Sequence, residues 1–133
     1  MRGWFVGGMV GLLVMQGMVA QSVAGPVADA AYAGMSEARK ALIAYVDAKE
    51  KNEQNRYLDE MRNASARVDL LVRQHGTALQ EFNSVWSAFK ATRDGEIIPL
   101  TKAGKHNEAK QLAGGVQADR LANMLKILSR VPQ

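Results

Sequence analysis

The sequence predicts an all-α protein folded as an up-down-up-down antiparallel four-helix bundle. The composition is rich in alanine, leucine, lysine, glutamine and glutamate, and long β-branched alternation is absent from the sequence. Apolar residues recur at steps of three and four in four segments, at about residues 28–49, 54–74, 77–102 and 107–129. The connections between these segments are short, so neighbouring helices are expected to be antiparallel.

The first 24 residues have the features of a leader that does not belong to the bundle. Arg2 precedes an apolar run, and Ser22-Val23-Ala24 fits the small-x-small pattern found before a cleavage site. We therefore predict a signal peptide at residues 1–24 and a periplasmic or secreted domain at residues 25–133. The alternative is an uncleaved inner-membrane anchor, because residues 4–20 approach the shortest length that spans a bilayer.

The first predicted helix begins near Ala28. Its apolar stripe consists of Met35, Ala38, Leu42, Tyr45 and Ala48. Seven residues without an apolar side chain follow this stripe, and we place the first turn among them. No glycine or proline marks the turn, so one unbroken helix over residues 28–74 remains an alternative.

The second predicted helix carries a stripe of its own, made of Leu58, Met61, Ser65, Val68 and Val72. The residues His75-Gly76-Thr77 are expected to end it, with Gly76 as the C-terminal stop. Thr77 is expected to cap the third helix, and Gln80 three residues later would complete a capping box.

The third helix contains the most regular stripe in the chain, and a charge interrupts it. Leu79, Phe82, Trp86 and Phe89 line one face, and the next position in register is Arg93. Pro99, further along, removes one backbone hydrogen bond from this helix. Gly104 supplies the turn that follows, because glycine adopts a positive φ without strain.

The fourth helix is predicted to bury one stripe of mostly aliphatic residues. The members are Ala109, Leu112, Ala113, Val116, Leu121, Met124 and Leu128. Gly114-Gly115 lies inside this helix, where each glycine costs about 1 kcal/mol relative to alanine. We expect the pair either to bend the hairpin or to permit a close helix approach.

Composition excludes several classes of function. The chain has no cysteine, which rules out disulfides, thiolate zinc sites and iron–sulfur clusters. Its net charge is +4, but the basic residues are mixed with acidic ones, so we expect a solvated surface and no nucleic-acid partner. The sequence shows no nucleophile–base pair, phosphate loop or carboxylate dyad. We therefore predict that the protein is not an enzyme and carries no cofactor.

The passage from the third to the fourth helix resembles a known family. Its characteristic residues are Trp86 and Phe89, Arg93-Asp94, Ile97-Ile98, Ala103-Gly104 and Glu108-Ala109. Together with the earlier helices, over residues 28–130, they resemble the four-helix-bundle sensor domain of methyl-accepting chemotaxis receptors. The resemblance implies an extracytoplasmic ligand-sensing module that is usually dimeric. No second apolar run follows the fourth helix, so we expect a stand-alone or truncated module.

Three arginines are the candidate ligand-binding residues. Arg93 occupies the apolar register of the third helix, Arg120 that of the fourth, and Arg39 borders the first stripe. An inward guanidinium needs a carboxylate or an anionic ligand, and its planar fork suits carboxylates. This predicts a small anionic ligand bound between helices. The alternative is that these side chains reach the surface or pair with nearby acidic residues.

Two other functions remain open at this point. The bundle could be a purely structural or interaction module, packing as a homodimer or against a membrane receptor. It could also be a b-type haem carrier, with Met35 and His75 as the iron ligands. The alternative role of His75 is an interaction with the last carbonyls of its helix.

Overall fold

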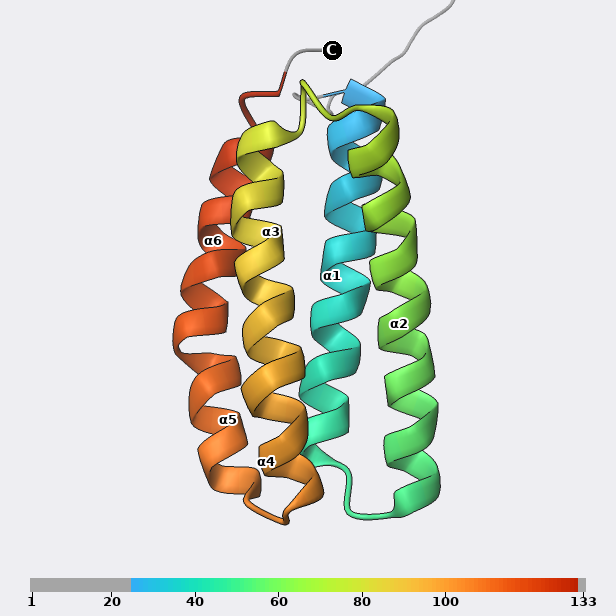
Figure 1. Cartoon of the computed structure of the whole chain (residues 1–133), viewed down its shortest axis with the longest axis vertical. Coiled ribbons are helices and arrows are strands. Elements are labelled where there is room, and N and C mark those ends of the chain that lie inside the picture. Colours follow the sequence, from blue (N-terminus) through green and yellow to red (C-terminus); the bar gives the residue numbers. More distant parts are fainter. Residues whose placement is uncertain (1–24, 132–133) are drawn as a thin grey trace, which may run out of the picture.

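The computed structural model describes residues 25–131, and all regular secondary structure in this range is helical. Four helical columns lie side by side, and consecutive columns run in opposite directions (Figure 1). The columns are α1 (Gly25–Asp47); α2 (Lys51–Gln74); α3 (Gln80–Thr92) with the π-helix η2 (Arg93–Ile97) and α4 (Ile98–Lys102); and α5 (His106–Gly114) with α6 (Val116–Leu128). The all-helical prediction is confirmed, and the arrangement is compatible with the predicted bundle.

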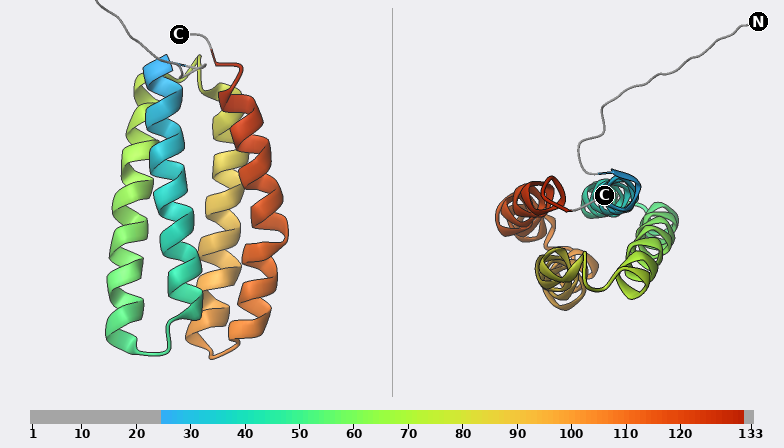
Figure 2. Two further views of the ribbon diagram at one scale, coloured as in Figure 1. Left: turned by 180° about the vertical axis from the view of Figure 1, so that it is seen from behind. Right: turned by 90° about the horizontal axis from the view of Figure 1, so that it is seen from above.

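The columns enclose one hydrophobic core. Viewed end-on, they stand around a common centre, and α1 lies between α2 and the column of α5 and α6 (Figure 2). The predicted stripe Phe82, Trp86 and Phe89 is fully buried, and its rings stack with centroids 6.2 and 5.6 Å apart. The other fully buried large side chains include Tyr45, Met35, Leu42, Met61, Leu79, Ile97 and Met124. Most of the predicted stripe positions therefore lie in the core.

The first turn separates α1 from α2, so a single helix over residues 28–74 is wrong. Helix α1 ends at Asp47 and α2 begins at Lys51. The side chain of Gln54 donates a hydrogen bond to the carbonyl of Ala48, at 3.0 Å, and so satisfies a carbonyl at the end of α1. The chain reverses at the predicted place, and α2 starts three residues before its predicted boundary.

The capping box predicted at the second turn does not form. Helix α3 begins at Gln80, and its N-cap is Leu79, with no side-chain cap hydrogen bond. The amide of Leu79 donates to the carbonyl of His75 at 2.9 Å, so the backbone keeps winding through Thr77 and delays the start of the helix. Helix α2 does end just before Gly76, but Gly76 does not adopt a positive φ. Gly104 does, with φ of 80°, as predicted.

The third column widens into a π-helix immediately before Pro99. The amide of Ile98 donates to the carbonyl of Arg93, five residues earlier. A proline has no amide hydrogen, and its ring collides with the carbonyl four residues earlier in a regular α-helix. The wider turn relieves that collision, and the helix continues into α4. The sequence indicated the lost hydrogen bond but not the π-helix.

The fourth column breaks at Gly115, and the break corrects one predicted core position. Val116 is 38% exposed, whereas the neighbouring Gln117 is fully buried. The backbone departs from helical geometry at Gly115, so the register after it differs from that of an unbroken helix. A Cβ atom at Gly115 would lie 2.7 Å from the carbonyl oxygen of Gln111, which explains glycine at this position.

Among residues 25–131, no helix has the length and apolarity needed to cross a membrane. The signal peptide predicted at residues 1–24, and the alternative anchor at residues 4–20, lie outside the described residues.

Candidate functional site

Arg93 is held by the protein itself. Its side chain is buried between the third column and α2, where Nη1 donates to Ser65 Oγ at 2.6 Å. Its Nε and Nη2 donate to the two carboxylate oxygens of Asp94, at 2.8 and 3.3 Å. This is the pairing that the sequence left open as the alternative to a ligand site. The guanidinium therefore has internal partners on both of its sides.

Arg120 also has partners within the chain. Its Nη1 donates to Thr92 Oγ1 at 2.6 Å and to Gln117 Oε1 at 3.0 Å. The amide nitrogen of Gln117 donates to the carbonyl of Phe89 at 2.8 Å. These bonds join α6 to the end of α3. Arg120 is thus part of a polar link between two columns, with no carboxylate among these partners.

Asp69 completes the polar contacts between α2 and the third column. It accepts hydrogen bonds from Trp86 Nε1 at 2.8 Å and from Lys90 Nζ at 2.7 Å. Burial raises the pKa of Asp69, but the hydrogen bonds from Lys90 and Trp86 outweigh burial and leave its pKa below the usual value. Sequence reasoning missed this residue, although an acid inside the run Val68 to Leu71 was a usable signal.

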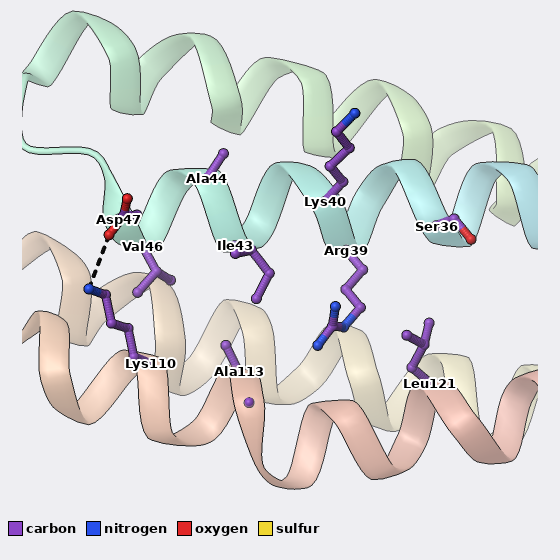
Figure 3. Close-up of a pocket in the computed structure, with 11 residues that line it drawn as sticks. Ser36, Arg39, Lys40, Ile43, Ala44, Val46, Asp47, Lys110, Ala113 and Leu121 are labelled. Atoms are coloured by element: carbon purple, nitrogen blue, oxygen red, sulfur yellow. Dashed lines mark ion pairs between the residues drawn. The ribbon is translucent and has the colours of Figure 1, made fainter.

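Arg39 differs from the other two arginines. Its Nε is buried and makes no hydrogen bond within residues 25–131. The side chain leaves α1 and points toward the column of α5 and α6, across a cleft of about 600 Å³ (Figure 3). The three predicted arginines therefore face three different helix–helix contacts and do not converge on one site. Of these three arginines, only Arg39 borders a cleft with a donor that has no partner.

The cleft is apolar over most of its length. Ile43 and Val46 of α1 line it on one side, and Ala113 and Leu121 line it on the other. The side chain of Lys40 also borders it but extends toward α2, away from α5 (Figure 3).

An ion pair closes one end of this cleft. Lys110 of α5 lies 3.0 Å from Asp47 at the end of α1. The hydrogen bond from Lys110 and its positive charge hold the pKa of Asp47 below the usual value. Asp47 is therefore ionised at neutral pH and offsets the charge of Lys110.

The room in the cleft comes from small residues at the column break. Ala113 and Gly114 stand opposite α1, and a Cβ atom added at Gly114 would meet nothing within 4 Å. The sequence indicated that Gly114-Gly115 is unusual in a helix. It did not show that Gly115 allows the break, or that Gly114 leaves open space beside it.

The two residues proposed for haem lie in different surroundings. Met35 is fully buried in the hydrophobic core, and His75 is half-buried at the end of α2, where its amide donates to the carbonyl of Leu71 at 2.8 Å. Neither residue lines the cleft. The other histidine, His106, uses Nδ1 in a 2.7 Å hydrogen bond with the carbonyl of Val46. Over residues 25–131, no three acidic or histidine side chains are grouped to hold a metal ion.

Comparison with protein-family models, curated proteins and solved structures found no match to this chain.

Proposed function

We propose that this chain is an exported, non-catalytic up-down-up-down helical bundle, similar to a chemoreceptor sensor domain, that binds a small anionic ligand between α1 and the column of α5 and α6. The observation that supports this proposal best is the buried, unpaired Nε of Arg39 at the cleft. The guanidinium of Arg39 makes no hydrogen bond or ion pair within residues 25–131, so an anion in the cleft can pair with its terminal nitrogens. Arg93 and Arg120 have internal partners, so they give no comparable support.

The site has the character of a binding pocket. Small-molecule pockets are mostly apolar and hold a few polar groups that fix the orientation of the ligand. The cleft has this composition, with Arg39 as the group that would recognise a negative charge. A ligand held there would contact both α1 and the broken fourth column. A sensor module could respond to the ligand through a change between these two helices.

Ligand-induced shifts in melting temperature test this proposal. The wild-type chain should melt higher with phosphate, sulfate or short carboxylates present, after correction for the general effect of ionic strength. Arg39→Gln should remove the shift and keep the helical circular-dichroism spectrum. Arg73→Gln removes the same charge from an exposed position in the last turn of α2, and it should keep the shift.

Two results would contradict the proposed anion site. If the wild-type chain shows no shift with any of these anions, or if Arg39→Gln keeps the shift, the cleft is not the site of an anionic ligand. The chain would then be treated as a purely structural or interaction bundle, and its oligomeric state would become the first measurement.

Export is tested separately. We expect the chain produced in a bacterial host to be recovered from the periplasm with Gly25 as its first residue. A chain that stays in the membrane fraction at full mass would instead support the anchor at residues 4–20.

A further inference from the structure

We infer that the cleft selects a monocarboxylate with an apolar body, whose carboxylate binds Arg39 and whose body extends along α1 toward the Asp47–Lys110 ion pair. This inference rests on the proposed function and narrows it from small anions in general to one chemical class. Three features of the cleft support it: its charge, its lining and the order of its residues.

The charge indicates a single carboxylate. Three cationic side chains border the cleft: Arg39, Lys40 and Lys110. Lys110 is already paired with Asp47 at 3.0 Å, and Lys40 extends away from the cleft (Figure 3). Only Arg39 remains to receive a negative charge. A second carboxylate on the ligand would meet no free cation and would lie beside Asp47.

The lining indicates an apolar body. Ile43, Val46 and Ala113 line the cleft between Arg39 and the ion pair, and of these Ile43 is the one whose side chain is exposed. Ile43 is 39% exposed, so a ligand that covers it removes apolar surface from water. A compact inorganic anion would bind Arg39 and leave this surface uncovered.

The order of the residues gives the orientation. Val46, Ile43 and Ala113 lie between the ion pair and Arg39 along the cleft (Figure 3). A ligand whose carboxylate binds the guanidinium and whose body points this way covers Ile43, which is more exposed than Leu121 on the other side of Arg39 (Figure 3). The cleft volume of about 600 Å³ lies within the range of small-molecule pockets. The guanidinium fork can contact both carboxylate oxygens through its two Nη atoms.

Isothermal titration calorimetry on the full chain tests this inference with a matched ligand series. The ligands are acetate, butyrate, hexanoate, hexanol, adipate and sulfate. Affinity should rise by about fourfold for each added methylene from acetate to hexanoate. Hexanol lacks the charge and adipate carries a second one, so both should bind at least about tenfold more weakly than hexanoate.

Two variants place the binding in the cleft. Arg39→Gln should weaken hexanoate by at least about tenfold and leave hexanol unchanged. Gly114→Leu fills the open space beside Ala113, so it should weaken hexanoate and hexanol together. Arg73→Gln, far from the cleft in sequence and exposed on α2, should change neither. If Gly114→Leu fails to fold, the ligand series and Arg39→Gln still decide the question.

The outcomes separate this inference from the proposed function. If acetate or sulfate binds as tightly as hexanoate, and Arg39→Gln abolishes that binding, the apolar body is wrong and the proposed anion site stands. If hexanol binds as tightly as hexanoate, the role of the carboxylate is wrong. If no ligand of the series binds the wild-type chain, both proposals are wrong.

Discussion

Arg93 and Arg39 lie in two different contacts between columns, and their surroundings are opposite. Between α2 and the third column, Arg93 is buried to 5% exposure and bonded to Ser65 and Asp94. Between α1 and the column of α5 and α6, Arg39 keeps a buried Nε without a partner. A guanidinium with internal partners is a structural element, whereas a partly exposed one without them can still bind a ligand. The difference separates the packing arginine from the binding candidate.

The largest expected effect on stability is at Arg93. Arg93→Gln should lower the free energy of unfolding by about 3 kcal/mol, because it removes buried hydrogen bonds and leaves a space in the core. Arg39→Gln should lower it by less than about 0.5 kcal/mol, because no hydrogen bond to Arg39 is lost. Urea unfolding followed by circular dichroism measures both values. Equal losses for the two variants would show that Arg39 is also a structural residue.

Asp69 gives the next largest effect. Asp69→Ala should destabilise the fold by about 2 kcal/mol, because it leaves the Trp86 Nε1–H without its acceptor and Lys90 without its partner. The fluorescence of the buried Trp86 should change in the folded state. Asp59→Ala, at an exposed position of the same helix, is the control and should cost less than about 0.5 kcal/mol.

The pH dependence of stability should reveal the same contact. The pKa of Asp69 is lower in the folded than in the unfolded chain, so the folded chain binds fewer protons at this group. Its stabilising contribution is present above the ordinary aspartate pKa, 3.8, and is lost as the pH falls through the lower folded value. Urea midpoints of Asp69→Asn should therefore fall less than those of the wild type between pH 5 and 2. Parallel curves for the two proteins would contradict this assignment.

The smallest effects concern the two adjacent glycines beside the cleft. Gly115→Ala should cost about 1 kcal/mol or more, because its Cβ would meet the carbonyl of Gln111 at 2.7 Å. Gly114→Ala should be neutral or should stabilise by up to about 1 kcal/mol, because its Cβ meets open space in a helix. Thermal melts of both variants measure these two changes in stability. Equal losses would mean that the break depends on both glycines.

Most of the fold prediction came from apolar residues spaced three and four apart, the period of an α-helix. The buried positions of α1, α2 and α3 follow apolar spacing closely, because each helix turns one face to a common core. The prediction failed where local geometry departs from that period. Thr77 does not cap α3, and Val116 lies outside the core because the break at Gly115 changes the register.

The candidate site was predicted only in part. Arg39, Arg93 and Arg120 were predicted from their positions near apolar stripes, without a ranking among them. Arg93 bonds to Ser65 and Arg120 to Thr92, each 28 residues away in another column, so these pairings depend on how the columns are placed. Arg39, which borders the first apolar stripe in the sequence, faces the cleft.

The sequence by itself determined an all-helical chain, the approximate ends of its helices and most of its core, because these follow from local spacing and composition. Tertiary structure decided which buried polar side chains have hydrogen-bond partners, because many of those partners lie in a different column. It also decided where space remains, because the cleft at Gly114 exists only once α1 and the broken fourth column face each other.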